Sequence, residues 1–563
     1  MTQRCSAGVL ACEFWWRLAA STRSTAGRDA RLTRRRGRLR HCLPARLILI
    51  VTLALCAVSC KVGPNYTTPA AKVAGQWRAN PAVTNQAYSA AEEYWWRNFH
   101  DPVLDQLIES AFQNNLSLQV AGVRILEARA KLNKSIGNLF PQQQALSGQL
   151  NYRRLNDGIV TRIPGIERDY LSDQVLFAAT WEIDFWGKYR RAIESDRAAY
   201  LGALASYDDA LVTLIGDVAS SYVNIRTLEE RLRVARRNVE LQRESLRIAT
   251  VRFKAGETSE RDAQQATTQL GQTESQIPLL EEAVIQNKDG LAVLLGQTPD
   301  EIDRRLAGPS RIPTAPATVA AGIPRDLLRR RPDVRAAGLA AASQCALIGV
   351  AKATMYPSFS LAGEFGLTGN NEANNSLSDM FNWESRALST GAGFTFPIFN
   401  YGRLINQVRV QDAQFQAAVL QYQNMVLSAQ REVEDGLAAF ANQQRSATLL
   451  AQAVVAARRS TELAMIQYKG GQTDYTTVVN AEQSQLAVEN SLASTQGNVV
   501  LGIISVYRAL GGGWQIREGH DVVSDEVKAE MARRTDWGRL LEPGRHLPSS
   551  PPAKDVTQAK EGK

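Results

Sequence analysis

Cys60 is the residue whose type and surroundings most clearly suit a chemical reaction. It follows a run of about twelve apolar residues at 47–58 (LILIVTLALCAV), which matches the core of a secretory signal and is short for a membrane span. The three residues directly before it (AVS) are small. This arrangement resembles a bacterial lipobox, in which the cysteine thiol receives diacylglycerol and the cysteine becomes the mature N-terminus. We therefore interpret residues 1–59 as a lipoprotein-type leader and Cys60 as the lipid attachment site.

Two alternatives to this assignment stay open. Ala57 stands where lipoboxes favour Leu, and Cys56 is a rival that follows Leu55, a bulky residue where a small one is needed. The segment is also compatible with a plain secretory signal that happens to precede a cysteine. Lys61 follows Cys60, and the absence of Asp at that position favours the outer membrane over retention at the inner membrane.

Other patterns that support catalysis or cofactor binding are missing from the sequence. The four histidines, at positions 41, 100, 520 and 546, are too scattered to form a metal cluster. No GxxxxGK[ST] phosphate loop occurs, because the glycines at 511–513 precede no Lys-Ser/Thr pair. The acidic residues fall on long helical patterns, where charge usually marks a solvated face. The sequence thus predicts no catalytic residue, no metal and no cofactor, and not an enzyme.

The net charge of +9 belongs to the leader. Residues 1–59 contain eleven arginines against two acidic residues, so basic and acidic residues balance from Cys60 onward. A neutral mature chain offers no long-range field for a phosphate backbone, which excludes nucleic acid as a partner. Only Cys345 follows Cys60 among the cysteines, so a disulfide framework is excluded as well.

The elements that must position any site occur twice. The pairs 186–187, 255–256 and 295–296 mark one unit, and each is matched about 215 residues later, at 401–402, 470–471 and 510–511. The expected organisation is a leader at 1–59, a lipid-anchored extended segment at 60–100, a first repeat at 101–307, a linker or equatorial segment at 308–323, a second repeat at 324–515 and a polar, partly disordered tail at 516–563.

Each repeat is expected to hold a helix, two strands and a long helical hairpin. The first helix is expected to run from Asp101-Pro102 towards Phe140. Alternation of apolar and polar residues then predicts strands near 143–153 and 175–181, long enough to cross a membrane at a tilt, although a soluble hairpin fits this signal equally well. Three- and four-residue apolar steps predict a helix from Lys188 to Lys254, followed by a turn at Gly256 and a return helix.

Four strands cannot close a barrel, and open sheet edges are not viable in lipid. If the strands lie in a membrane, several copies must share one barrel, and three copies would supply about twelve strands. The long helices would then form a water-lined tube, which predicts a conduit. The competing class is a lipid-anchored periplasmic coiled-coil scaffold without a pore, which leaves the four alternating segments unexplained.

Four motifs carry a resemblance to a known family: CKVGPNY at 60–66, YWW at 94–96, YKGG at 468–471 and ALGGGW at 509–514. With these motifs, the chain resembles the outer membrane factor (TolC-like) family of tripartite efflux systems, and specifically the NodT-type outer membrane efflux lipoproteins. The resemblance covers about 60–516. It implies a mainly α homotrimer, with a twelve-stranded β-barrel in the outer membrane of a Gram-negative bacterium and an α-barrel of duplicated helical hairpins in the periplasm.

The same resemblance implies the function and the partners. The trimer would be a passive exit duct for drugs or other small toxic compounds, delivered by an inner-membrane pump of the resistance-nodulation-division (RND) type through a periplasmic adaptor (membrane fusion) protein. The same machinery with polysaccharide or peptide cargo is a further alternative. The sequence itself does not name the cargo.

The resemblance also implies functional residues at the periplasmic end. The expected gate consists of Asp474, Tyr475, Thr476 and Asn480. The chain departs from relatives that have Leu at position 476 and Asp at position 480, so we expect a more weakly held gate. The expected adaptor contacts are the hairpin tips at Gly256 and Gly471. The alternative is that these residues only start and end helices, with Asp474 as a cap.

Overall fold

The computed structural model describes residues 61–78, 83–84, 93–154, 169–307, 311–316, 319–320, 330–370, 377–542 and 544. The expected leader, the lipid attachment site Cys60 and the end of the tail lie outside the described residues. The described residues from Lys61 onward belong to one compact unit by their internal contacts.

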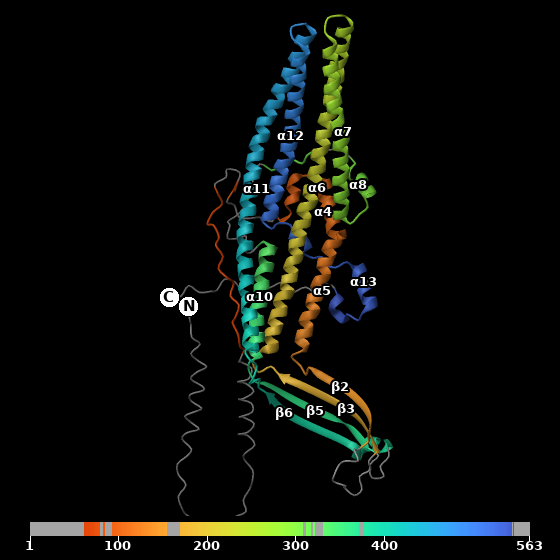
Figure 1. The fold of residues 1–563 in the computed structure, drawn as a ribbon, viewed down its shortest axis with the longest axis vertical. Helices are drawn as coiled ribbons and strands as arrows, with labels where there is room; N and C mark the ends of the chain where they lie inside the picture. The colour runs from red at the N-terminus through yellow and green to blue at the C-terminus, as the bar shows by residue number, and fades with distance from the viewer. Residues whose placement is uncertain are drawn as a thin grey trace, which may run out of the picture. The chain divides into compact units, whose positions relative to one another are not determined.

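The two repeats contain matching elements (Figure 1). The first holds α4 (Pro102–Asn114), α5 (Leu116–Gly137), β2 (Gln143–Arg154), β3 (Asp169–Ile183), α6 (Lys188–Lys254) and α7 (Glu260–Leu295). The second holds α10 (Pro332–Ala353), β5 (Ser358–Asn370), β6 (Arg386–Thr395), α11 (Arg403–Lys469) and α12 (Tyr475–Ala509). Both α6 and α11 have 67 residues, which is roughly 100 Å of helix at about 1.5 Å per residue. The expected duplication and the expected bounds of α6 are confirmed.

Short elements join these parts. They are β1 (Val83–Thr84), η1 (Trp95–Phe99), α8 (Pro299–Leu306), β4 (Val319–Ala320), η4 (Leu377–Phe381) and η5 (Trp383–Ser385). The strand β1 pairs in parallel with β4, so the N-terminal segment meets the linker between the repeats.

Glycines with positive φ set both ends of the hairpins. Gly187 and Gly402 precede α6 and α11, each with φ near +79°. Gly256 and Gly471 follow these helices at φ +79° and +70°. Residues with a Cβ rarely adopt this left-handed conformation, which explains why glycine stands at the same points of both repeats.

The strands form one antiparallel sheet in the order β2-β3-β5-β6. The central pair joins the repeats, with Phe177 opposite Phe365. Large apolar side chains on the outer strands are exposed, among them Leu146, Leu150 and Leu388. The described part of the chain therefore leaves an apolar face of the sheet uncovered.

The helices pack as two antiparallel hairpins that lie side by side (Figure 1). The first is α6 with α7, the second is α11 with α12, and α6 also contacts α12, α10 and α5. Among the described helices, α10 is long and apolar enough to cross a membrane, but it packs against both α6 and α11.

One expected helix is two helices in the structure. The expectation of a single helix from Asp101-Pro102 towards Phe140 is wrong, because the chain breaks at Asn115. The Asn115 Oδ1 atom accepts a hydrogen bond from the Leu118 N–H at 2.8 Å, and its Nδ2 donates to the Leu294 carbonyl at 2.8 Å. An asparagine side chain that bonds nearby backbone groups competes with the helical ladder, which explains the break.

The beginning of the C-terminal tail is folded. It forms η6 (Trp514–Arg517), α13 (Asp525–Arg534) and η7 (Gly538–Leu541). Val522 and Val523 are buried in the main hydrophobic cluster, and a Cβ on Gly122 of α5 would lie 2.0 Å from the Val522 carbonyl oxygen. The sequence predicts a polar, partly disordered tail here because the chain becomes charged beyond Trp514 and rich in Pro and Ser from Pro543.

Candidate functional site

The two hairpin tips have the same backbone geometry. At the first tip, the Gly256 N–H donates to the Phe253 carbonyl and the Glu257 N–H donates to the Arg252 carbonyl, both at 2.9 Å. The second tip repeats this pattern around Gly471. Both tip glycines are exposed. The structure thus places the two expected adaptor-contact residues at accessible turns.

A group of side chains, here called the tip lock, joins the two tips: Arg252, Asp262, Tyr468 and Tyr475. The Arg252 guanidinium lies 4.7 Å from the centre of the Tyr468 ring and donates a hydrogen bond to the Tyr468 carbonyl. The Tyr468 hydroxyl donates to Asp262 Oδ2 at 3.3 Å, and its ring packs edge-on against Tyr475 at 5.1 Å. These contacts hold the end of α11 against the end of α6 and the start of α7.

The four expected gate residues have different surroundings. Asp474 is exposed and caps α12, accepting hydrogen bonds from the Thr477 N–H at 3.3 Å and the Thr477 hydroxyl at 3.1 Å. Tyr475 is 1% exposed within the tip lock, and burial raises the pKa of its hydroxyl above the ordinary value. Thr476 is half-buried and Asn480 is exposed. Sequence reasoning missed Arg252 and Asp262, which lie on the other hairpin.

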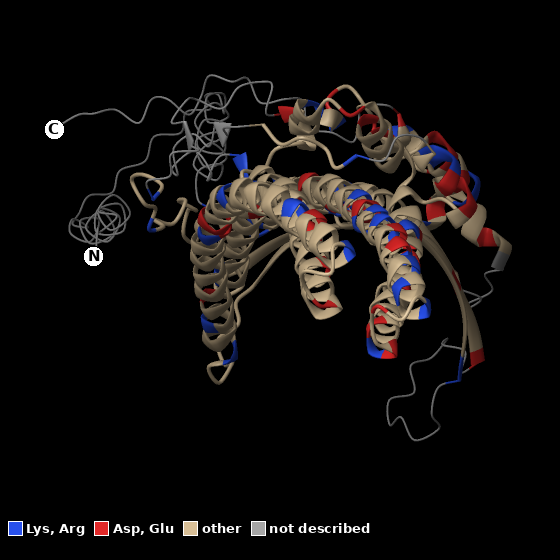
Figure 2. Cartoon of the chain, turned by 90° about the horizontal axis from the view of Figure 1, so that it is seen from above, with Lys and Arg blue, Asp and Glu red and all other residues tan. Residues whose placement is uncertain are grey.

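The two hairpins have the same backbone arrangement but differ in how many charged side chains they carry. Together α6 and α7 carry about twice as many charged side chains as α11 and α12 (Figure 2). Several form ion pairs across the first hairpin, including Arg236 with Glu281 at 2.7 Å and Arg243 with Glu274 at 2.9 Å. The two copies have therefore kept their buried positions and diverged on their surfaces.

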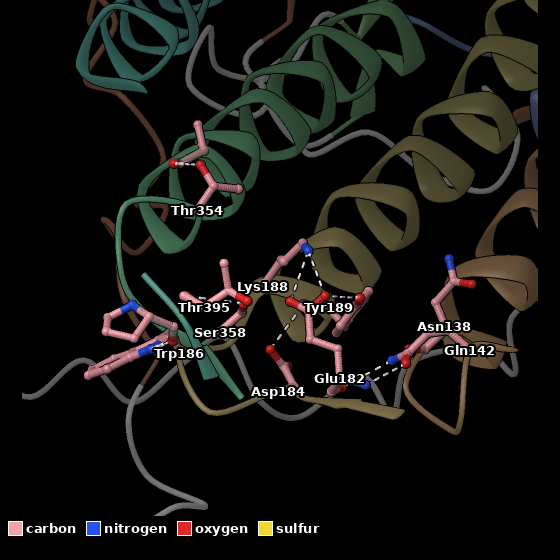
Figure 3. A network of polar contacts seen from close by, with 12 residues as sticks. Asn138, Gln142, Glu182, Asp184, Trp186, Lys188, Tyr189, Thr354, Ser358 and Thr395 are labelled. Atoms are coloured by element: carbon pink, nitrogen blue, oxygen red, sulfur yellow. Dashed lines mark hydrogen bonds and ion pairs between the residues drawn. The ribbon is translucent and has the colours of Figure 1, made fainter. Parts of the chain in front are cut away.

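A polar cluster fixes the junction between β3 and α6 (Figure 3). The Lys188 ammonium donates to both Glu182 carboxylate oxygens, at 3.0 and 3.2 Å, and the Tyr189 hydroxyl donates to Glu182 at 3.0 Å. Asp184 accepts from the Tyr189 N–H at 3.1 Å. The Trp186 Nε1–H donates to the Pro357 carbonyl at 2.7 Å. These bonds tie the end of β3 to the start of the long helix and to Pro357, the residue before strand β5 of the second repeat.

Residues 61–78, here called the N-terminal strap, begin at this junction. The Val62 N–H donates to the Trp186 carbonyl at 3.1 Å, and Lys61 forms an ion pair with Glu194. Arg191 is 1% exposed and donates to the carbonyls of Val62 and Gly63, at 3.0 and 3.1 Å. The position after Cys60 is therefore held where a strand gives way to a long helix.

The rest of the strap runs along α11. Gln423 donates to the Ala70 carbonyl at 3.0 Å. Gln430 donates to the Lys72 carbonyl at 3.0 Å and accepts from the Ala74 N–H at 2.8 Å. Side chains of α11 thus form hydrogen bonds with backbone groups of the extended strap, which pairs with no strand within 61–78.

Comparison with known proteins places this geometry in a family. The family model for outer membrane efflux proteins matches residues 107–297 and 323–512, one segment in each repeat. The solvent efflux pump outer membrane protein SrpC of Pseudomonas putida is 30% identical over 474 residues, which are 82% of this chain and 96% of that protein. Nodulation protein T of Rhizobium leguminosarum bv. trifolii is 29% identical over 441 residues, 77% of this chain and 90% of that protein.

A solved structure agrees with the sequence relatives. The outer-membrane channel OprN superimposes with a TM-score of 0.74 at 29% identity, covering 81% of this chain and 100% of that one. The resemblance inferred from the four motifs is confirmed, and the scaffold alternative is not favoured. The chain belongs to the outer membrane efflux protein family and is an outer-membrane channel component of an efflux system, a transport protein and not an enzyme.

Proposed function

We propose that three copies of this chain form the passive exit duct of a tripartite efflux system. The four-stranded sheet is the observation that carries the proposal, because within the described residues β2 and β6 pair along one edge only. Unpaired edges are not stable in lipid, and a closed membrane barrel needs about eight strands or more. Three sheets joined edge to edge give a closed barrel of about twelve strands. The exposed Leu146 and Leu388 would then face lipid.

The helical hairpins extend this barrel as a tube in the periplasm. Only a few residues separate β3 from α6 and β6 from α11, so each long helix begins close to the end of a strand. The bonds of Glu182, Asp184 and Trp186 hold the first of these junctions rigid. A twelve-stranded barrel above and an α-barrel below would share one lumen.

The proposed partners are those that the family resemblance implies, and the exposed tips support them. Gly256 and Gly471 would meet a periplasmic adaptor (membrane fusion) protein, which connects the duct to an inner-membrane pump of the RND type. The proposed cargo is drugs or other small toxic compounds, which the solvent-pump relative SrpC supports. Asp474, Tyr475, Thr476 and Asn480 would form the gate, with the exposed Asp474 and Asn480 nearest the lumen and Tyr475 tying the gate to the first hairpin.

Conductance tests the duct directly. Purified full-length protein in planar bilayers is expected to give discrete ion-conducting steps, and native mass spectrometry is expected to give three copies per particle. Protein that inserts into the bilayer but conducts in neither the wild-type form nor any gate variant would favour the scaffold without a pore.

Lipidation at Cys60 is the second part of the proposal. The bond from Val62 to Trp186 supports it, because it holds a residue two positions after Cys60 beside the strand-to-helix junction, where attached acyl chains would reach the inner leaflet of the outer membrane. Cells fed labelled palmitate are expected to label the wild-type protein and a Cys56→Ser variant equally, and Cys60→Ser not at all. Label that persists in Cys60→Ser and disappears in Cys56→Ser would move the attachment to Cys56.

A further inference from the structure

Six buried polar residues lie along the contact between the two hairpins, at one level of α6 and α12. This group, here called the polar seam, has members that are each at most 5% exposed: Asn238, Gln242, Ser245, Glu482, Gln485 and Glu489. Such a stripe is unusual in a helix contact, because buried polar groups destabilise the packed state unless they are hydrogen-bonded.

Apolar contacts flank the polar seam on both sides. On the side of the sheet, Val223 and Tyr222 of α6 belong to the same hydrophobic cluster as Val500 and Ile503 of α12. The helices come very close at the end of this cluster, because a Cβ on Gly497 would lie 2.2 Å from the Thr227 hydroxyl oxygen. On the side of the tips, Ile248, Tyr468, Tyr475 and Val478 form a separate small cluster. The polar seam therefore lies between the apolar contact of α6 with α12, which ends at Gly497, and the tip lock.

The two halves of the polar seam differ in how well they are bonded. In the half nearer Gly497, Glu489 accepts from Asn238 Nδ2 at 2.9 Å and from Arg458 Nε at 2.6 Å. In the half nearer the tips, Ser245 donates to one Glu482 oxygen, but the other oxygen, Oε2, has no partner in the described structure. Both amide atoms of Gln242 are likewise buried without a partner there.

Within the described part of the chain, no cation forms an ion pair with Glu482. The charged and titratable groups around it are Arg237 and Glu244 on α6, Asp262 on α7, Arg458, Glu462 and Lys469 on α11, and Tyr475 and Glu489 on α12. Arg458 is engaged by Glu489. Burial raises the pKa of Glu482, and only the Ser245 hydrogen bond opposes that effect. A groove of about 580 Å³, lined in part by Ser245 and Glu482, brings solvent to the edge of the polar seam.

We propose that the polar seam is the surface along which the second hairpin separates from the first, with the Gly497–Thr227 contact as the pivot and ionisation of Glu482 as the driving event. The proposal rests on the duct and gate proposed above, and it specifies how the gate is regulated. The packed tips accommodate a neutral Glu482 carboxyl, whereas the carboxylate is more stable in water. The packed arrangement is therefore fully favoured at low pH and loses stability as the pH rises through the raised pKa of Glu482.

Hydrogen exchange of the full-length wild-type protein tests this inference. After correction for intrinsic rates, backbone amides of 475–490 are expected to lose protection as the pH rises through the raised pKa of Glu482, while amides of 499–509, beyond the pivot, stay protected. Glu482→Gln keeps the shape of the side chain but cannot ionise. In this variant, protection of the amides of 475–490 is expected to be independent of pH. Glu462→Gln, on the exposed side of α11, is the matched control and is expected to follow the wild type.

Gln242→Leu provides a second test that does not depend on titration. It removes two unpaired polar atoms from the packed state, and exchange in 475–490 is expected to slow about tenfold. The inference is overturned if the wild type conducts normally and yet its protection is independent of pH, or if Glu482→Gln behaves as the wild type. Absence of conductance in every variant would instead refute the duct, whatever the exchange data show.

Discussion

Arg517→Ala is expected to destabilise the protein by about 3–5 kcal/mol, the usual cost of leaving a buried charge without its partner. Arg517 donates to the two carboxylate oxygens of Asp208 at 2.7 and 3.3 Å, and Asp208 is fully buried. The guanidinium of Arg335 lies 3.8 Å from one Asp208 carboxylate oxygen, which is too far to replace both hydrogen bonds of Arg517. The pair also fastens the folded part of the tail to α6, so the variant is expected to melt earlier and to be cut by protease within 518–542.

A double variant distinguishes the effect of leaving Asp208 without its charge partner from the effect of losing the packing of the Arg517 side chain. Arg517→Met combined with Asp208→Leu is expected to recover most of the stability, because apolar residues of similar size often replace a buried ion pair without loss. Arg539→Ala is the control in the same tail: it breaks an exposed pair with Glu542, and its effect is expected to stay within about 0.5 kcal/mol. Equal melting temperatures for Arg517→Ala and Arg539→Ala would contradict this account.

Arg252→Ala is expected to open the duct. The change removes a charged hydrogen bond to the Tyr468 carbonyl and the stacking of the guanidinium on the Tyr468 ring. A hydrogen bond to a charged group contributes about 1.5–3 kcal/mol, and each 1.4 kcal/mol changes an equilibrium about tenfold. The fraction of time spent conducting in planar bilayers is therefore expected to rise by at least about tenfold, with the size of the full conducting step unchanged.

A neighbouring arginine supplies the control for charge. Arg247 is exposed on the same helix, and among the described residues its side chain bonds Glu244, one turn away. Arg247→Ala removes one positive charge at a similar height and is expected to conduct like the wild type. If both variants open the duct equally, the effect belongs to the net charge of the tip and not to the tip lock.

The long elements could be predicted from the sequence because their signals are local and repeated. The seam from Tyr200 to Val239 fixes the buried face of α6, and the Gly at 187 and 256 fix its ends. A single glycine or a single apolar run does not by itself define an element, but the second copy with the same spacing shows that both belong to a repeated helical hairpin. The glycine conformations explain why the bounds agree to the residue.

Features that depend on distant partners could not be predicted. The break at Asn115 is stabilised by the carbonyl of Leu294, 179 positions away. Arg191 looks like any helix-surface arginine until Val62 and Gly63 fold against it. No periodicity in α6 or in the strap encodes these contacts.

The candidate gate shows the same limit. The four expected gate residues, Asp474, Tyr475, Thr476 and Asn480, lie at the start of one helix, which can be recognised from the sequence. Arg252 and Asp262 act on this segment from the other hairpin, so only the folded chain brings them to Tyr468. Tyr475, expected at the gate, is packed inward by these neighbours.

The strap also dictates an order of assembly. Its hydrogen-bond partners Gln430 and Glu434 lie about 356 positions further along the chain. A chain that is exported N-terminus first therefore carries an unsatisfied leading segment until α11 has followed it and folded. Contacts of such long sequence separation form slowly, since a large loop must close before they bring any gain. The second half of the strap is thus fixed only after α11 has arrived, and protection of residues 70–78 from protease would report that a newly exported chain has folded as far as α11.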